Sequence, residues 1–378
     1  HMLRGKEADM DEEFVRTLCQ EKGVNYICYR EDIALYTPFA DSYDDSLTCQ
    51  RVRVHTHMAP FGDNSYVRVE RMGISNALVL NTDTKKLPDT FAGYFDKIMV
   101  DAPCSGEGMF RKNAEEALSE WNEENVALCA ARQKRIVADV WPALATGGFF
   151  VYSTCTFNVY ENDGNVRWIS EELGAEPLYR EDALEPAGGV LKTELGYSLV
   201  PGHVEGEGQY CSALRKTSDV EFRQVRMKPQ KPAAAKPAPV PKGLEKLVSV
   251  PVKIRQRGET VIAVPEVIAS DLTLVEQPLH VLAAGCALGT LKGSTLVPDA
   301  DLALSMMLAE DAFPYVDVDL DTALAYLHRD AITLQDAPKG FVIIRYAGLP
   351  LGFVKNLGNR CNSLHPQSRR IRMDINKK

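Results

Sequence analysis

The sequence has no long hydrophobic run. None of its apolar stretches approaches the roughly twenty residues that a membrane-spanning helix needs, although 45% of its residues are hydrophobic. It also lacks the basic-then-apolar opening of a secretory signal peptide. At 378 residues, the chain can hold two or three domains with sizeable cores. These features predict a soluble protein of the cytoplasm that contacts no membrane; we expect a monomer, although the sequence does not define the oligomeric state.

The cysteines form no regular framework. Nine of them are scattered along the chain without a CxxC pair, which favours reduced thiols over structural disulfides. Cys49, His55 and His57 lie near one another in sequence, but their spacing matches no standard zinc pattern. We therefore expect no metal site.

The charge is unevenly distributed. The chain carries a formal net charge of −9. Residues 339–378 alone carry nine Lys or Arg and one Asp, a net charge of +8, which leaves −17 for the remainder. A basic terminal segment on an acidic protein is typical of a phosphate-binding surface. A solvated tail is the alternative explanation.

Two short apolar stretches each lead into a cysteine. The first lies in residues 94–112 (YFDKIMVDAPCSGEGMFRK), where Asp101 and Cys104 follow a run typical of a buried strand. The second lies in residues 148–153 (GFFVYS) and leads into Cys155. Ligands bind at the carboxyl edge of open α/β sheets, so we predict adjacent parallel strands whose two thiols share one site. Either cysteine alone would more often be a small core residue.

The segment between these stretches has helical spacing of its apolar residues. One or two helices are predicted over residues 113–146, ended by Gly147-Gly148. A further helix is expected over 161–173, a late strand over 211–214 and a hairpin over 340–355.

The two cysteine motifs resemble those of a known enzyme family. Residues 101–108 (DAPCSGEG) and 153–157 (STCTF) look like the motifs of RNA 5-methylcytosine methyltransferases of the NOP/Sun type, and especially of the bacterial 16S rRNA enzymes. The resemblance covers about residues 70–378. It implies an α/β fold: a Rossmann-like class I methyltransferase core followed by an α+β, PUA-like RNA-binding domain.

The resemblance also implies residue roles. Cys155 would be the nucleophile that adds to cytosine C6, Cys104 would assist the later elimination, and Asp101 would contact the base edge. S-adenosyl-L-methionine would be the cofactor, with Asp83, Asp101 and Pro103 beside it. For Asp83, a simple Asx turn is the alternative. The implied partner is ribosomal RNA of the small subunit.

One element of that family is missing from the sequence. The glycines before Gly73 are Gly5, Gly23 and Gly62, each isolated, whereas the family holds the cofactor at a glycine-rich turn after its first strand. Residues 1–30 instead resemble a fragment of tRNA(Ile)-lysidine synthetase, without the phosphate loop of that family. We therefore expect a core that is incomplete at its amino side and a chimeric chain.

The missing turn leaves alternatives open. One is a catalytically impaired RNA-binding protein, and another, based on residues 1–30 alone, is an ATP-dependent tRNA-modifying enzyme. The expected domains are an atypical segment (1–69), a methyltransferase core (70–226), a Pro/Lys/Ala-rich linker (227–243) and an RNA-binding region (244–378).

Overall fold

A computed structural model describes residues 33–36, 53–56, 69, 72–111, 114–179, 188–204, 206–219, 241–334 and 337–373. The chain divides into two compact units, each assembled from several stretches. The first takes residues 1–63, 78–228 and 271–283, and the second takes 64–77, 229–270 and 284–378. The predictions for residues 1–30, for the side chains of Cys49, His55 and His57, and for linker residues 227–240 fall outside the described residues.

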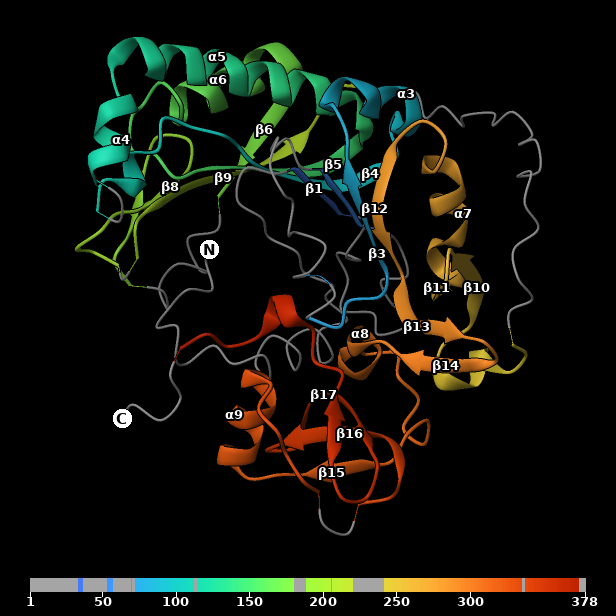
Figure 1. Cartoon of the computed structure of the whole chain (residues 1–378). Coiled ribbons are helices and arrows are strands. Elements are labelled where there is room, and N and C mark those ends of the chain that lie inside the picture. Colours follow the sequence, from blue (N-terminus) through green and yellow to red (C-terminus); the bar gives the residue numbers. More distant parts are fainter. Residues whose placement is uncertain are drawn as a thin grey trace. The chain divides into compact units, whose positions relative to one another are not determined.

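The first unit is built on one sheet (Figure 1). Its strand order is β12-β3-β2-β1-β4-β5-β9-β8-β7, and β6 also pairs with β9. The strands are β1 (Ile33–Tyr36), β2 (Arg53–Thr56), β3 (Ala77–Asn81), β4 (Phe95–Asp101), β5 (Leu144–Thr154), β6 (Ala175–Leu178), β7 (Val190–Lys192), β8 (Tyr197–Leu199), β9 (Gln209–Lys216) and β12 (His280–Ala284).

The two strands that lead to the cysteines lie side by side. β4 and β5 are parallel, with Met99 opposite Val151 and Asp101 opposite Ser153. This confirms the predicted adjacency of the two strands. β9 pairs with the other edge of β5 in the antiparallel direction, so β5 is hydrogen-bonded on both sides. Parallel strands paired on both edges are typical of an α/β core, in which apolar residues are buried on both faces of the sheet.

The amino side of the sheet departs from a parallel core. β1 lies between β2 and β4 and runs antiparallel to both. Its register places Ile33 opposite Val100 and Tyr36 opposite Lys97. The carboxyl end of β1 therefore lies at the opposite edge of the sheet from the carboxyl end of β4.

Helices pack on the sheet of the first unit (Figure 1). They are α3 (Leu87–Phe91), α4 (Ala114–Glu120), α5 (Glu123–Val140) and α6 (Asp163–Leu173). Asn122 precedes α5, and its side chain accepts a hydrogen bond from the N–H of Asn125 and caps the first turn. The buried residues of α5 and α6 recur at helical spacing (Val126, Cys129, Gln133, Ile136, Val137, Val140, Val166 and Ile169). The apolar strand residues Ile98, Val100 and Phe150 are also buried, and each such burial stabilises the fold by about 1.5–3 kcal/mol.

The end of α5 differs from the sequence prediction. The helix ends at Val140, and a short 3-10 turn containing Pro142 follows it. Proline has no backbone N–H to continue the helical ladder. The prediction that Gly147-Gly148 ends the helix is wrong, because both glycines lie inside β5, which already begins at Leu144.

The second unit contains two four-stranded sheets. The first has the order β10-β11-β13-β14 and the second β15-β16-β17-β18. The strands are β10 (Val252–Arg257), β11 (Thr260–Pro265), β13 (Cys286–Lys292), β14 (Thr295–Pro298), β15 (Tyr315–Asp317), β16 (Gly340–Tyr346), β17 (Leu349–Asn356) and β18 (Cys361–Ser363). Helices α8 (Ala300–Leu304) and α9 (Leu320–His328) accompany them, and α7 (Glu266–Val275) is shared between the units.

The predicted hairpin near the carboxyl end is confirmed. β16 and β17 pair antiparallel, from Gly340 opposite Asn356 to Tyr346 opposite Leu349. The turn is tighter than expected, because only Ala347 and Gly348 lie outside the pairing. Both have positive φ angles, 48° and 81°, as in the turns that match the natural twist of two-residue hairpins.

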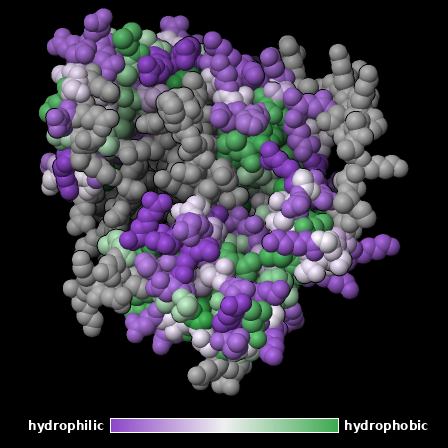
Figure 2. All heavy atoms as spheres, viewed as in Figure 1, coloured by the Kyte–Doolittle hydropathy of each residue, from purple (hydrophilic) through white to green (hydrophobic). Residues whose placement is uncertain are grey.

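The described residues hold neither a membrane-spanning helix nor a cluster of metal ligands. Within the described residues, no helix is both long and apolar enough to cross a membrane. In the same part of the chain, no three His, Cys, Asp or Glu side chains gather as metal ligands would. Hydrophilic side chains cover much of the described surface on the face shown in Figure 2, with smaller hydrophobic groups between them.

Candidate active site

Two thiols meet at the carboxyl ends of β4 and β5. The Sγ atoms of Cys104 and Cys155 are 3.1 Å apart, within hydrogen-bond range for sulfur. Both are free cysteines with partly accessible side chains. The sequence predicted a shared site for these two residues, and the structure brings them together.

The surroundings of Cys104 disfavour its thiolate. The pKa of Cys104 is raised well above its usual value, first by the hydrogen bond with Cys155 and next by burial. The charge of Cys155 and that of Glu161 add to this increase. Burial and like charges both destabilise an anion. Cys104 therefore keeps its proton at neutral pH and can donate it toward the sulfur of Cys155.

Asp101 is the last residue of β4, three residues before Cys104. Its side chain is 7% exposed, and its Oδ1 accepts hydrogen bonds from Ser153 Oγ at 2.8 Å and from Gln209 Nε2 at 3.2 Å. Ser153 and Gln209 come from β5 and β9, the next two strands of the sheet. Three adjacent strands thus fix the carboxylate at the edge where the cysteines lie.

The carboxylate of Glu107, on the Cys104 loop, binds the Cys155 loop. Its Oε2 accepts hydrogen bonds from the backbone N–H groups of Phe157 at 2.6 Å and Asn158 at 3.0 Å. Its Oε1 accepts from Trp121 Nε1 at 3.0 Å and Asn158 Nδ2 at 3.1 Å. Burial alone raises the pKa of Glu107, but hydrogen bonds to its charged form outweigh burial and lower it.

The carboxylate of Glu161 makes the reverse connection. It follows Cys155 in sequence, is fully buried, and accepts a hydrogen bond from the N–H of Ser105 at 3.0 Å. Gln133 Nε2 on α5 and Asn158 Nδ2 also donate to it, at 2.6 Å and 2.7 Å. Each loop therefore supplies a carboxylate that binds the backbone of the other. We call Glu107 and Glu161 the reciprocal clamp.

A glycine lets the two loops approach closely. The N–H of Gly108 donates to the carbonyl of Cys155 at 2.7 Å. A Cβ atom at position 108 would lie 2.6 Å from that carbonyl oxygen, closer than real Cβ contacts come. Gly108 is therefore required for the contact between the loops rather than for its own backbone angles.

Two of the predicted cofactor residues, Asp83 and Pro103, make local contacts of different kinds. Asp83 follows β3, is exposed, and caps a 3-10 turn (Thr84–Lys86) by accepting from the N–H of Lys85 at 3.1 Å. This is the local turn role that the sequence left open as the alternative. The carbonyl of Pro103 accepts from Gln133 Nε2 at 3.0 Å and is thus directed toward α5.

A binding site for S-adenosylmethionine requires backbone contacts in addition to the side chains of Asp83 and Asp101 and to Pro103. A glycine-rich turn at the carboxyl edge would allow the close backbone approach that its ribose and methionine groups require. β1, the strand beside β4, points its carboxyl end to the opposite edge, and the glycines before Gly73 are isolated in sequence. The described residues therefore do not complete a site for this cofactor.

Four polar residues of the site were missed by the sequence reasoning: Glu107, Gln133, Asn158 and Glu161. A signal for the two acids did exist, because each lies within six residues of a cysteine, in a glycine-rich or hydroxyl-rich loop where a charge must find partners if it is buried. No comparable signal marks Gln133, which lies on a regular helical face.

The parallel pair β4–β5, with two touching thiols and an acid at its carboxyl edge, is the arrangement that the motif resemblance predicted. Residues 63–215 match the family model described as 16S rRNA methyltransferase RsmB/F. Residues 313–371 match the model described as the methyltransferase RsmF PUA domain. Two segments of the chain are thus similar to these models, in agreement with the motif resemblance.

Individual relatives agree with the family models. The chain is 26% identical over 322 residues to ribosomal RNA small subunit methyltransferase F of Enterobacter sp. (strain 638), covering 80% of this chain and 64% of that protein. It is 34% identical over 157 residues to the protein of the same name from Pectobacterium atrosepticum, covering 41% and 32%. The chain thus spans just under two thirds of the Enterobacter relative. Among solved structures, NSun6 from Pyrococcus horikoshii with SFG is 25% identical, with a TM-score of 0.34 and coverage of 41% and 38%.

Proposed function

We propose that this chain is an RNA (cytosine-C5) methyltransferase acting on small-subunit ribosomal RNA through a covalent cysteine adduct. The observation that carries the proposal is the 3.1 Å contact between the sulfurs of Cys104 and Cys155 at the carboxyl ends of β4 and β5. The family models, which describe 16S rRNA methyltransferases, support the substrate class.

The chemistry explains why a thiol is needed. Cytosine C5 is too weak a nucleophile to take a methyl group directly. The Cys155 thiolate, formed by loss of its proton to solvent, adds to C6, breaks the aromaticity of the ring and shifts electron density onto C5. Cys104, whose raised pKa keeps it protonated at neutral pH, donates a hydrogen bond to the Cys155 sulfur before the attack.

The second cysteine acts late in this proposal. Once Cys155 is bonded to the base, its sulfur is neutral, and the largest influence that raised the pKa of Cys104 is gone. Cys104 can then lose its proton to solvent, and its thiolate takes the C5 proton. The C6–S bond breaks with its electron pair going to sulfur, which restores the aromatic ring and releases Cys155 as a thiolate.

Asp101 and the second unit contribute binding. Asp101, which accepts hydrogen bonds from Ser153 and Gln209, would share a proton with N3 of the cytosine and so stabilise the adduct. A base inside a helix cannot reach the thiol, so the target must be single-stranded or flipped out. In residues 313–371, the segment that matches the PUA model, Lys355, Arg360 and Arg370 are exposed and available to phosphates.

Not every basic residue near the carboxyl end is available to RNA. Arg345 pairs with Asp317 through two hydrogen bonds, of 3.0 and 2.7 Å, and Arg369 pairs with Asp301 at 2.6 Å. These two arginines stabilise the second unit. The net charge of +8 over residues 339–378 therefore counts more basic side chains than are available to phosphates.

S-adenosyl-L-methionine is the methyl donor that the family implies. The described residues do not complete its site, and the adduct chemistry above depends on this chain's own residues only. The test therefore separates adduct formation from methyl transfer by using two modified RNAs.

The experiment uses 16S rRNA transcripts that contain 5-azacytidine or 5-fluorocytidine. A thiol adds to C6 of either base. The azacytosine adduct needs no methyl transfer, whereas the fluorocytosine adduct becomes permanent only after methylation, because fluorine cannot leave as a cation. We expect a Cys155-dependent shifted band on a denaturing gel with the azacytidine RNA. Absence of any Cys155-dependent band with both RNAs would overturn the proposal.

A second candidate function is RNA binding without methyl transfer. The antiparallel direction of β1, which leaves the carboxyl edge without a cofactor turn, favours it. In that case the fluorocytidine RNA gives no stable band even with S-adenosylmethionine present, while RNA binding persists. The same gel therefore distinguishes the two candidates.

A further inference from the structure

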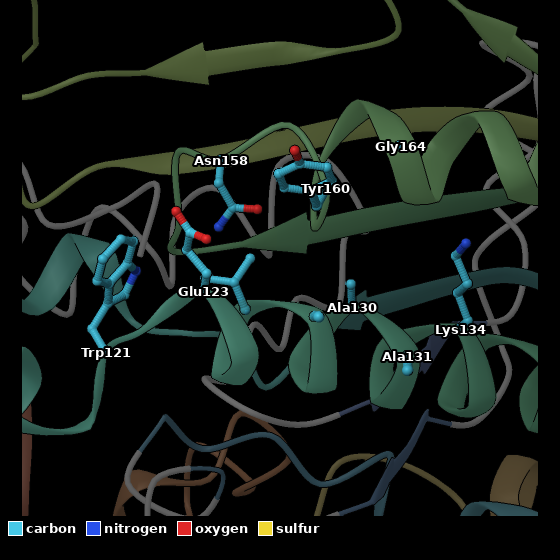
Figure 3. Close-up of a pocket in the computed structure, with 10 residues that line it drawn as sticks. Trp121, Glu123, Ala130, Ala131, Lys134, Asn158, Tyr160 and Gly164 are labelled. Atoms are coloured by element: carbon cyan, nitrogen blue, oxygen red, sulfur yellow. The ribbon is translucent and has the colours of Figure 1, made fainter.

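A cavity of about 710 Å³ lies beside the cysteine loops, within the first unit. It is formed by α5 and by the segment that joins β5 to α6 (Figure 3). This volume is typical of small-ligand sites, which measure about 300–1,000 Å³. Its lining is Trp121, Glu123, Val126, Ala127, Ala130, Ala131, Lys134, Asn158, Tyr160 and Gly164.

The shape of the cavity suits a flat ring. Its floor on α5 consists largely of alanines, which leave room above the helix. Trp121 stands at one end of the row of lining side chains and Lys134 at the other, with Asn158 and Tyr160 on the facing segment (Figure 3). The cavity thus combines an apolar floor, two aromatic rings, an amide, one cation (Lys134) and one carboxylate (Glu123).

The segment after the nucleophile exposes apolar side chains to an unusual degree. Phe157 is 38% exposed, Val159 55% and Tyr160 69%. Exposed apolar side chains that lie together indicate a binding surface more often than isolated ones do. Tyr160 follows Cys155 by five residues, so the two are at most about 17 Å apart along the chain.

The polar groups of the cavity are held in place from outside it. The Lys134 ammonium lies 5.6 Å from the centre of the Trp168 ring, a distance at which a cation is attracted to the ring face. The Asn158 amide binds both carboxylates of the reciprocal clamp, at 3.1 Å to Glu107 and 2.7 Å to Glu161. A ligand in the cavity would therefore contact the same network that positions the cysteine loops.

We propose that this cavity binds an unpaired nucleobase of the RNA that neighbours the target cytosine, stacked on Tyr160, with Lys134 near the adjoining phosphate. The proposal rests on the proposed function, because nucleotides that neighbour a cytosine at Cys155 would lie within reach of the segment 157–160. Aromatic stacking of unpaired bases beside a basic residue is the common mode of single-strand recognition, and it tolerates any base.

The test is a thermodynamic cycle in Cys155→Ala protein, which can form no adduct. Binding of a short, fluorescein-labelled adenosine oligonucleotide with one central cytosine is measured by anisotropy. A second oligonucleotide lacks the bases on either side of the cytosine. Tyr160→Ala is compared with the Tyr160 protein on both RNAs, and Tyr160→Phe retains the ring.

We expect Tyr160→Ala to weaken binding of the intact RNA about 5- to 150-fold, the range that loss of one stacked base gives. Removing the flanking bases should weaken binding by a similar factor. Combining Tyr160→Ala with the RNA that lacks these bases should weaken binding no more than either change alone. Tyr160→Phe should bind as the Tyr160 protein does. The matched control is Tyr179→Ala, which removes a 40% exposed tyrosine that does not line this cavity and should change nothing.

Unchanged affinity in Tyr160→Ala, or factors that simply multiply in the doubly altered complex, would overturn the proposal. The cycle measures binding alone, so its outcome does not depend on whether adducts form. Adduct formation without coupling to Tyr160 would reject the cavity and keep the proposed function. Coupling to Tyr160 without adduct formation would keep the cavity proposal and reject the proposed function.

Discussion

The Glu107 carboxylate accepts a hydrogen bond from the backbone N–H of Phe157 at 2.6 Å, across fifty residues of sequence. Glu161 returns the connection by accepting from the N–H of Ser105. Hydrogen bonds to an ionised carboxylate are roughly twice as strong as neutral ones. The distance between the two sulfurs is therefore set by a pair of buried charges as well as by the sheet.

We predict that Glu107→Gln destabilises the protein by about 1–3 kcal/mol at pH 7. The folded-state pKa of Glu107 is lowered, so its charged form stabilises the fold above the unfolded value of about 4.3. That contribution is lost as the pH falls through the folded-state pKa. Urea unfolding along a pH series should therefore show the two proteins converging in acid. Glu194→Gln, which disrupts an exposed ion pair with Arg167, should have little effect at any pH.

A second prediction concerns the reactivity of Cys104. Cys155→Ala removes the hydrogen bond that most raises the pKa of Cys104, together with the charge of Cys155. The pKa should fall, so more thiolate exists at a given pH and alkylation by iodoacetamide should be faster at pH 8. Peptide mass spectrometry would follow the rate at Cys104, with Cys361 as an internal reference in the second unit. An unchanged or slower rate at Cys104 would show that the two thiols do not interact.

The third prediction compares two glycines of one loop. Gly108→Ala places a Cβ 2.6 Å from the carbonyl oxygen of Cys155, whereas Gly106→Ala meets nothing within 4 Å and strains only its own φ of +78°. Both should cost about 1–3 kcal/mol in urea unfolding. Only Gly108→Ala should slow adduct formation, by at least about tenfold, because it displaces the Cys155 loop. Equal slowing by both would mean that general loop strain, not this contact, controls the site.

The fourth prediction separates the roles of the two cysteines. Cys155→Ala should abolish adduct formation and methyl transfer, since no other group can add to C6. If methylation occurs, Cys104→Ala should accumulate a covalent protein–RNA species, because the elimination step loses its base. A denaturing gel with unmodified RNA would show a shifted band for Cys104→Ala alone. Identical behaviour of the two variants would reverse or remove the assignment.

The fifth prediction is that the chain binds S-adenosylmethionine poorly while still binding RNA. Loss of two or three charge-assisted hydrogen bonds, each worth about 1.5–3 kcal/mol, weakens binding by several powers of ten. RNA affinity should persist and fall steeply with salt, because it depends on phosphate contacts. Calorimetry with the cofactor and salt-dependent titration with 16S rRNA test both parts. Micromolar cofactor affinity would mean that residues outside the described ranges complete the pocket.

Much of the thiol site could be predicted from local sequence. The apolar run 98–100 and the run 148–153 each end at a polar loop, and this pattern was enough to predict that β4 and β5 lie side by side. The hairpin at Ala347-Gly348 was equally visible from its turn residues. Such features depend on a few neighbouring residues and on the geometry that parallel strands impose.

Other features depended on contacts between distant residues. The predicted end of α5 was six residues too late. Gly147-Gly148 is a strong helix terminator in sequence, but the helix already ends at Val140, just before the 3-10 turn that contains Pro142. The reciprocal clamp joins acids to backbone groups about fifty residues away in sequence. The spacing of apolar residues does not predict contacts of this kind. The direction of β1 could not be predicted because residues 36–66 show poor periodicity.

The reciprocal clamp also limits where recombination can divide such a sequence. Glu107 lies in the first cysteine motif and binds the loop of the second, while Glu161 lies after the second and binds the loop of the first. A recombination junction anywhere between residues 108 and 156 would pair each acid with a foreign loop. The two motifs must therefore be inherited together, whereas junctions on the amino side of β4 leave this set of contacts undivided.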